Sequence, residues 1–554
     1  MINTERVIRR RLRFAVLAGG LWAGQLLAGS ATRTVDRLQT EARGMYLLWA
    51  ENRADQEELL QLPFVRGGQV TIQWADVERK PGAYDFAEID RKIAWLAERG
   101  KWMTVQVNGN RKPAWLFSQV PHIPRKLHHQ VQDAEGTLMF WHPRFEAAHL
   151  AMLRALAAHL RANPHRDRLL GIRLNFNAVG TEQLEVPEAL RNPDSWVCPA
   201  GVEPGRMSAY TPAVREAYLD RVIEAYKREF SGWTVVFVRN QVEGGLLAKL
   251  APDFRAGNLG LFHTGSEAEP RTAAIERRYG LFNDYARSGD TVAYAEPWAS
   301  AWGEHGGKLD ARWCSPCQWN YWTLLLNLHC GVSFIGEYYA NLHFAVTAEH
   351  AGPPGATVKP EEQAKEFKAA YAWADRYVGR HNRPEETPGA WVAFRDNREI
   401  KARNNDAPPE AWRLTRFAGD YSFLMERLDG DGSAGVGPVG PPEQRYGAFA
   451  RSYAAGGVAR LKLNEAFRRS LVKGAVVRVI YLDEARTASA VVAVPSPAGS
   501  APLGELSFHG TGRWVTAEFF LPAVVLASAA PDRQIEVSAG AAPLILHLVE
   551  VGRL

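Results

Sequence analysis

From Gly44 onward the chain alternates strand-like and helix-like segments, and this alternation limits its fold more than any other feature. Eight short apolar runs have the composition of buried strands, at residues 45–50, 69–73, 102–107, 169–175, 233–238, 259–263, 291–295 and 332–335. Runs with helical periodicity separate them, at residues 86–98, 145–161, 212–230, 273–286, 319–328 and 361–378. Such alternation is typical of a parallel sheet with crossover helices. Eight strands predict a (β/α)8 TIM barrel.

A doubly wound open sheet would show the same alternation. No Gly-rich phosphate loop follows the first strand, which disfavours that fold. After residue 385 the pattern changes to short strands separated by turns, at residues 391–395, 411–417, 447–453, 458–463, 476–482, 488–494, 514–521, 534–539 and 544–551. We therefore predict an α/β barrel at residues 41–385, a β-rich connection at 386–441 and an all-β sandwich at 442–554.

The first 31 residues have the pattern of a signal peptide. Basic residues cluster at positions 6–13, an apolar stretch covers 14–27, and small residues follow at 28–31. The apolar stretch is short for a membrane span, and no later segment is long and apolar enough to be one. We expect an exported protein, either secreted or periplasmic, with no membrane span after cleavage.

Composition narrows the range of partners and cofactors. The formal net charge of 554 residues is only +5, without the basic stripe that nucleic-acid binding requires. The four cysteines, Cys198, Cys314, Cys317 and Cys330, lack a paired CxxC arrangement, so disulfides or buried thiols are favoured over zinc. The chain has 18 tryptophans, many where loops are expected, and their flat faces suit sugar rings. We expect a carbohydrate partner and no metal or organic cofactor.

Two glutamates follow predicted barrel strands. Glu182 comes after the fourth strand, and Glu296 comes directly at the end of the seventh. Barrel active sites lie at the carboxyl ends of the strands, so both side chains are expected on one face. A pair of carboxylates can hydrolyse a glycoside, because one protonates the leaving oxygen while the other attacks the sugar. We predict that Glu182 and Glu296 are the catalytic residues.

Other polar and aromatic side chains near the strand ends are candidates for binding substrate. Asparagine and histidine can bond sugar hydroxyls, and an aromatic ring can stack on the sugar. The predicted substrate-binding residues are Trp74, Asn108, Trp115, Asn175, Asn177, His263, Trp298, Trp302, Glu337 and Tyr338. Arg173 and Arg239 could pair with the glutamates or form a salt bridge inside the barrel.

Residues 67–116 contain a specific pattern. Trp74, Glu78, the sequence YDF at 84–86 and Asp90 are followed by PAWL at 113–116. This segment resembles the second and third βα units of retaining barrel glycosidases of the clan A type, and in particular their β-galactosidase-like members. The resemblance implies hydrolysis of a β-linked oligo- or polysaccharide.

The same resemblance implies roles for the two glutamates. In that clan the acid/base follows strand 4 and the nucleophile ends strand 7, which are the positions of Glu182 and Glu296. The chain departs from the clan at strand 4, where an Asn-Glu pair is usual. Here Asn175 and Asn177 come first, and Glu182 follows Thr181 after a short loop.

Three alternatives remain open from the sequence. An inverting hydrolase could use Glu182 with another base such as Glu337. A barrel without catalytic activity could bind polysaccharide through its tryptophans and its sandwich. A polysaccharide lyase is less favoured, since neither a Tyr/His pair nor a calcium-binding loop is evident.

Overall fold

The computed structural model describes residues 35–184, 196–202, 209–240, 245–268, 273–297, 314–346, 360–395, 419–428, 430–484, 486 and 488–554. The predicted signal peptide, the predicted strand at 411–417, Trp298 and Trp302 lie outside these ranges. No helix within these ranges is long and apolar enough to span a membrane.

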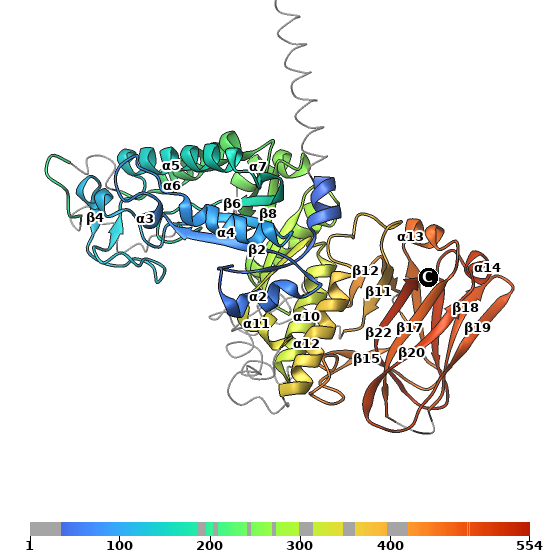
Figure 1. Ribbon diagram of the computed structural model, residues 1–554. Helices are drawn as coiled ribbons and strands as arrows, with labels where there is room; N and C mark the ends of the chain where they lie inside the picture. Colours follow the sequence, from blue (N-terminus) through green and yellow to red (C-terminus); the bar gives the residue numbers. More distant parts are fainter. Residues whose placement is uncertain are drawn as a thin grey trace, which may run out of the picture.

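Eight parallel strands close into a barrel (Figure 1). Around the barrel their order is β1-β10-β9-β8-β7-β6-β3-β2, so barrel strands that follow one another along the chain pair with each other. The strands are β1 (Gly44–Leu47), β2 (Val65–Gln73), β3 (Trp102–Asn108), β6 (Leu169–Arg173), β7 (Val235–Arg239), β8 (Leu259–Ser266), β9 (Ala293–Pro297) and β10 (Phe334–Glu337). Each overlaps one of the eight predicted strands, which confirms the TIM barrel.

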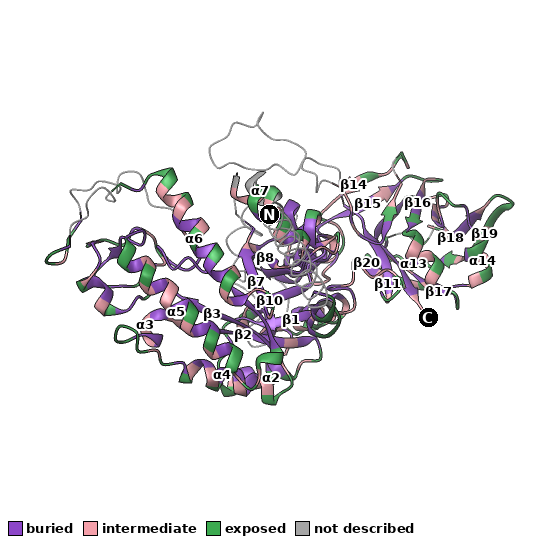
Figure 2. Cartoon of the chain, turned by 90° about the horizontal axis from the view of Figure 1, so that it is seen from above, coloured by how far each residue is buried: buried purple, intermediate pink, exposed green. Residues whose placement is uncertain are grey.

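Helices surround the barrel (Figure 2). They are α2 (Ala54–Gln61), α3 (Trp74–Val77), α4 (Ala87–Glu98), α5 (Pro143–Ala162), α6 (Pro212–Phe230), α7 (Gly245–Arg255), α8 (Ala273–Leu281), α10 (Pro316–His329), α11 (Tyr339–Phe344) and α12 (Pro360–Asp375). Those on the outside of the molecule, such as α4, α5 and α6, have buried inner faces and exposed outer faces, whereas α10 is buried along almost its whole length. Shorter elements are η1 (Leu38–Ala42), η2 (Ala114–Ser118), η3 (Arg166–Arg168), η7 (Phe282–Ala286) and the hairpin β4 (His122–Ile123) and β5 (Thr137–Leu138).

Alternate residues of the barrel strands face opposite sides, and this alternation separates two clusters of apolar side chains. Tyr46, Phe237, Phe262, Tyr294 and Phe334 come from five strands and pack together inside the barrel, with ring centroids 5.8–6.2 Å apart. Their neighbours along the strands point outward to the helices. These aromatic rings fill the barrel interior below the carboxyl ends of the strands.

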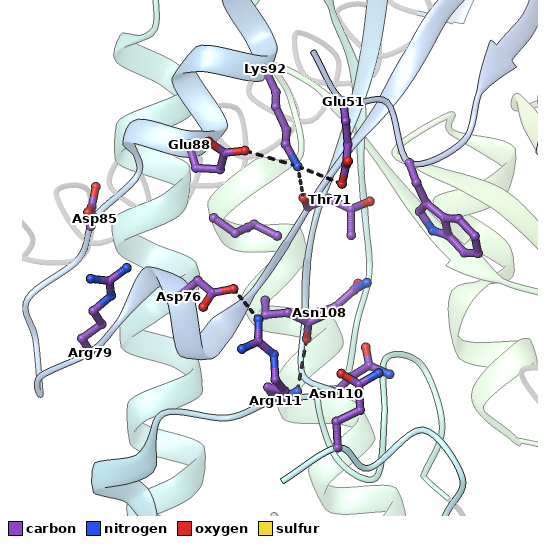
Figure 3. A pocket seen from close by; sticks show the side chains of 14 residues that line it. Glu51, Thr71, Asp76, Arg79, Asp85, Glu88, Lys92, Asn108, Asn110 and Arg111 are labelled. Carbon is purple, nitrogen blue, oxygen red and sulfur yellow. Dashed lines mark hydrogen bonds and ion pairs between the residues drawn. The ribbon is translucent and has the colours of Figure 1, made fainter. Parts of the chain in front are cut away.

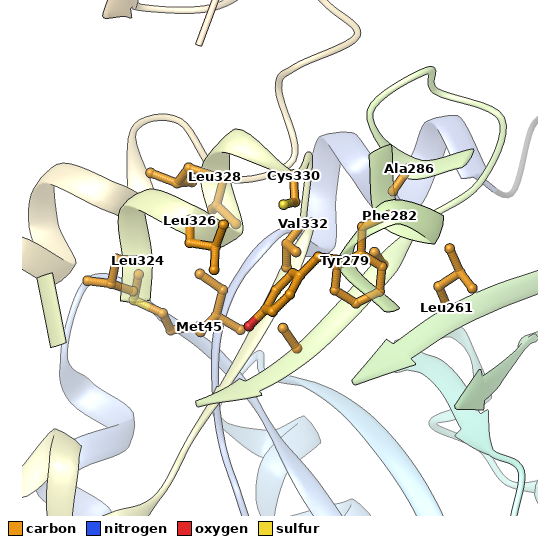
Figure 4. Packing of buried hydrophobic residues seen from close by; sticks show 14 of the residues in the cluster. Met45, Leu261, Tyr279, Phe282, Ala286, Leu324, Leu326, Leu328, Cys330 and Val332 are labelled. Atoms are coloured by element: carbon orange, nitrogen blue, oxygen red, sulfur yellow. The ribbon is translucent and has the colours of Figure 1, made fainter. Parts of the chain in front are cut away.

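The outward-facing side chains join the barrel to its helices. Met45 of β1 and Leu261 of β8 belong to the same buried cluster as Phe282 of η7 and Leu326 of α10 (Figure 4). Cys330, which follows α10, is also buried in this layer. Barrel and helices therefore share one apolar layer, which fixes the strand ends that carry polar residues.

The chain beyond the barrel forms two antiparallel sheets, as the predicted sandwich requires. One sheet contains β11 (Gly389–Ala393), β12 (Tyr421–Phe423), β14 (Ala434–Val436), β15 (Ala450–Tyr453), β17 (Ala475–Asp483), β20 (Arg513–Leu521) and β22 (Leu544–Arg553). The other contains β13 (Met425–Arg427), β16 (Val458–Leu463), β18 (Ala490–Ser496), β19 (Gly499–Leu506) and β21 (Ile535–Ala539). Two short helices, α13 (Glu465–Ser470) and α14 (Ala523–Ala527), lie among these strands. Strands β11 to β14 come from the stretch expected to be a connection.

Helices α10 and α12 lie between the barrel and the first of these sheets (Figure 1). Glu550 of β22 is buried at this contact and accepts hydrogen bonds from Trp373 Nε1 at 3.1 Å, Arg376 Nη2 at 3.0 Å and Arg478 Nη1 at 3.0 Å. Trp373 belongs to α12, and Arg376 directly follows that helix, whereas Arg478 belongs to β17. One carboxylate thus ties a barrel helix to two strands of the sheet.

We expect Glu550→Ala to destabilise the protein by about 2–3 kcal/mol, because it leaves two arginines and an indole at this contact without their shared acceptor. Urea unfolding measures the change. The matched control is Glu518→Ala, which removes the exposed partner of the same Arg478 at 2.6 Å and should cost less than about 1 kcal/mol. Equal losses in the two variants would contradict a special role for Glu550.

Candidate active site

A polar layer lies above the aromatic rings, at the carboxyl ends of the barrel strands. Glu296 is two residues beyond Tyr294 on β9, so the alternation of the strand points both into the barrel. Gln69 of β2, Arg173 of β6 and Arg239 of β7 reach the same layer, where their side chains contact the two predicted catalytic glutamates. The strands therefore place carboxyl and guanidinium groups together at the mouth of the barrel.

Arg173 joins the two glutamates. Its Nη2 atom lies 3.0 Å from Glu182 Oε1, and its Nη1 atom lies 3.2 Å from Glu296 Oε1. The guanidinium carbon is 3.8 Å from the centre of the Phe262 ring, at the top of the aromatic layer. The structure thus brings the two predicted catalytic residues to one guanidinium group.

Glu182 has more positive charge around it than Glu296 has. Arg239 Nη1 lies 3.3 Å from Glu182 Oε1, and the Thr181 hydroxyl donates to Oε2. Burial opposes ionisation, but Arg173 and Arg239 outweigh it and lower the pKa of Glu182 from 4.5 to about 2. Glu182 is therefore ionised in this arrangement.

Glu296 has the opposite electrostatic environment. Burial raises its pKa, and the attraction of Arg173 only partly offsets this. Gln69 Nε2 donates to Oε1 at 2.9 Å, which is the same oxygen that Arg173 contacts. The pKa values of the two carboxyl groups are thus shifted in opposite directions, as acid and base roles require.

A tight loop after β6 carries Glu182 to this layer. Asn177 has a left-handed backbone with φ of 52°, and its amide donates to the Thr181 carbonyl at 2.9 Å. Asn175 Nδ2 donates to the Val107 carbonyl at 3.0 Å and to Asn108 Oδ1 at 2.9 Å. These bonds tie the loop to the end of β3, so they position Glu182.

The tryptophans of the recognised sequence pattern have structural contacts. Trp74 is fully buried, and its Nε1 atom donates to Glu78 Oε2 at 2.8 Å. The Gly82 amide donates to the other oxygen of Glu78 at 2.8 Å, while Trp115 Nε1 donates to the Glu78 carbonyl at 3.2 Å. The pattern therefore stabilises the connection between β2 and α4, and Trp74 has no face open to a sugar.

Two further candidates point out of the barrel. On β8, His263 is one of the alternate residues whose side chains point outward from the barrel. Its Nδ1 atom shares a hydrogen bond of 2.9 Å with Asn240 Oδ1, and its ring packs against Tyr279 of α8. On β10, the side chain of Glu337 also points outward from the barrel, and Asn341 Nδ2 donates to its Oε2 atom at 3.0 Å. Both side chains lie in the helix layer rather than beside Arg173.

Tyr338 lies next to the glutamate pair. Burial raises the pKa of its hydroxyl, and the nearby charge of Glu296 adds to that effect. Its ring meets the ring of Trp49 edge to face, with centroids 5.0 Å apart. Trp49 was not among the residues predicted from the sequence, and neither was Gln69.

A polar groove of about 700 Å³ lies beside this site, over the ends of β2 and β3 (Figure 3). Its lining includes Trp49, Glu51, Gln73, Lys92, Asn108 and Arg111. We call it the rim groove. Across the parts of the chain that the structure describes, a search for three or more metal-ligating side chains in one group found none.

The buried carboxyl group of Glu337 gives a prediction about pH. Burial raises its pKa from 4.5 to about 8, although hydrogen bonds from Asn341 and Tyr371 oppose the shift. The stability contributed by the protonated form is present below pH 4.5 and is lost as the pH rises to about 8. Glu337→Gln should therefore be more stable than the wild type at pH 8, by up to about 4 kcal/mol, and similar to it at pH 4.

Thermal unfolding of both proteins between pH 4 and pH 9 checks this expectation. Hydrolysis should persist in Glu337→Gln, because the side chain faces the helix layer. Parallel stability profiles for the two proteins would contradict a protonated Glu337 at neutral pH.

Comparison with known proteins agrees with this fold. Residues 50–167 match the family model of glycosyl hydrolase family 42, described as beta-galactosidase. The comparison with curated proteins found no match.

Among solved structures, an isomalto-dextranase of Arthrobacter globiformis T6 complexed with panose is 10% identical, with 94% of this chain and 98% of that chain covered and a TM-score of 0.31. A glucosidase from Croceicoccus marinus is 11% identical over 93% and 96%, with a TM-score of 0.34. Endo-glycoceramidase II from Rhodococcus sp. is 14% identical over 87% and 97%, also with a TM-score of 0.34. The family match and the closed parallel barrel indicate a glycoside hydrolase whose barrel is similar to the β-galactosidase-like, clan A type.

Proposed function

We propose that this glycoside hydrolase cleaves β-linked oligo- or polysaccharides with retention of configuration, using Glu182 and Glu296. The observation that carries the proposal is the contact of both carboxylates with Arg173. Carboxyl groups about 5–5.5 Å apart act by double displacement, whereas inverting enzymes separate them by roughly 6.5–9.5 Å to admit water. Binding to the two terminal nitrogens of one guanidinium supports the shorter separation.

In the proposed reaction Glu296 attacks the anomeric carbon while Glu182 protonates the leaving oxygen. Glu182 then removes a proton from water, which releases the sugar from Glu296. Among the described residues, the side-chain donors to Glu296 reach Oε1, which leaves Oε2 for the attack. Glu182 must gain a proton before the first step, so substrate binding has to weaken its contacts with Arg173 and Arg239.

The charges around the pair favour a second assignment. Two arginines keep Glu182 ionised, as a nucleophile requires, and burial favours a proton on Glu296, as an acid requires. In that case Glu182 attacks and Glu296 is the acid/base. Both assignments use the same pair and the same retaining chemistry, so they differ only in which mutation removes the nucleophile.

We propose that Asn108, Asn175 and Tyr338 contact the substrate beside the pair. Trp298 and Trp302, which are not among the described residues, are also proposed to bind substrate. We also propose that the enzyme is exported, which rests on the pattern of residues 1–31. The inverting alternative with Glu337 is disfavoured, because that side chain lies in the helix layer.

Chemical rescue tests the mechanism and its assignment. Glu296→Ala and Glu182→Ala are each assayed with a panel of aryl β-glycosides, with and without azide. Loss of the nucleophile should reduce kcat by at least about 10³-fold, and azide should restore turnover with formation of an α-glycosyl azide. Loss of the acid/base should instead yield a β-glycosyl azide, because the covalent intermediate still forms.

An α-azide from Glu296→Ala would support the first assignment, and an α-azide from Glu182→Ala would support the second. Full activity in either alanine variant would contradict the proposed pair. An inverted product from the wild type would contradict the retaining mechanism.

A further inference from the structure

Two residues that line the rim groove contact residues of the proposed active site. Asn108 lines the groove, and its Oδ1 atom accepts from Asn175 in the loop that carries Glu182. At the other side, Trp49 lines the groove while its ring contacts Tyr338. These two contacts place the groove next to the site, where it can receive sugars that extend beyond the glutamates.

Trp49 is held in an unusual conformation at this rim. Its φ is 51°, in the left-handed region that bulky residues rarely occupy. The flanking amides are fixed, because Leu48 N donates to the Glu337 carbonyl at 2.9 Å and Ala50 N donates to the Gln69 carbonyl at 2.8 Å. The backbone between β1 and α2 thus holds the indole outward with 54% of its surface exposed. Strain of this kind is typical of binding sites.

The groove is lined by both positive and negative side chains, namely Arg79, Lys92 and Arg111 beside Glu51, Asp76, Asp85 and Glu88. Lys92 Nζ lies 3.5 Å from Glu88 and 3.9 Å from Glu51, and it donates to the Thr71 carbonyl at 3.1 Å (Figure 3). Arg111 pairs with Asp76 at 2.7 Å. With four carboxylates against three cations, two of which are already paired, the groove offers little attraction to a sulfated or acidic ligand.

The remaining lining suits a neutral ligand rich in hydroxyl groups. Gln73, Asn108, Asn110 and Gln132 present amides, which can both donate to and accept from hydroxyls. Trp49 adds an exposed aromatic face of the kind that packs against the C–H face of a sugar ring. Amides and one aromatic platform together provide what a neutral saccharide needs.

We propose that the rim groove is a saccharide subsite with Trp49 as its platform, so that the enzyme prefers neutral oligosaccharides that extend beyond the cleaved bond. This inference rests on the proposed function, because it takes the glutamate pair as the point of cleavage. It adds a preference for chain length and for uncharged sugars.

The test measures binding in the Glu296→Gln background, where hydrolysis does not interfere. Isothermal titration uses β-linked gluco-, galacto-, manno- and xylo-oligosaccharides of two to six units. At least one series should bind more tightly as the chain lengthens. We expect Trp49→Gly to weaken the binding of the longest oligosaccharide in that series about tenfold, which corresponds to about 1.4 kcal/mol. The unfolding temperature of the Trp49→Gly variant should stay equal or rise, because glycine accepts the left-handed backbone.

The matched control is Phe520→Ala, which removes an aromatic side chain of similar exposure, 59%, from the C-terminal sheet. It should leave the dependence on chain length unchanged. The inference is overturned if no series binds more tightly with length, or if Trp49→Gly keeps the full gain. Binding that depends on length without hydrolysis by the wild type would refute the proposed function and still support the subsite.

Discussion

The charge of Arg173 organises the barrel mouth, because a buried carboxylate needs a partner and this guanidinium serves two. Without it, Glu182 and Glu296 would repel each other in a site shielded from water. Arg239 adds a second positive charge, which contacts Glu182 directly and acts more weakly on Glu296. The asymmetry shifts the two pKa values apart, and that difference is what acid–base chemistry requires.

The aromatic layer below makes these charges effective. Phe262 contacts the guanidinium directly, and Tyr294 lies beneath Glu296 on the same strand. Apolar rings at this depth exclude water and lower the local dielectric, which strengthens every ionic contact above them. The alternation that points aromatic rings into the barrel therefore also places the carboxyl and guanidinium groups in one layer above them.

Much of this fold could be predicted from the sequence, and the exceptions have physical reasons. The eight strands are continuous apolar runs because both faces of a parallel barrel strand are buried. That property also hides which face is inward, so His263 and Glu337 were predicted at the site although they face the helices. Helix α2 has a mostly polar sequence and shows no clear helical period, and α7 contains Pro252, a residue that disfavours a helix in a reading of the sequence.

The recognisable pattern and the chemistry depend on different residues. Trp74 and Glu78 support the loop after β2, so they report the fold of the barrel rather than its catalysis. The proposed catalytic layer departs from the clan pattern at β6, where Arg173 ends the strand and Glu182 follows in the next loop. In the proposal that makes Glu182 the acid, this loop-borne glutamate has to leave two arginines before it can carry a proton, so catalysis would depend on substrate binding. In the second assignment the same two arginines keep Glu182 ionised as the nucleophile, and substrate binding need not displace them.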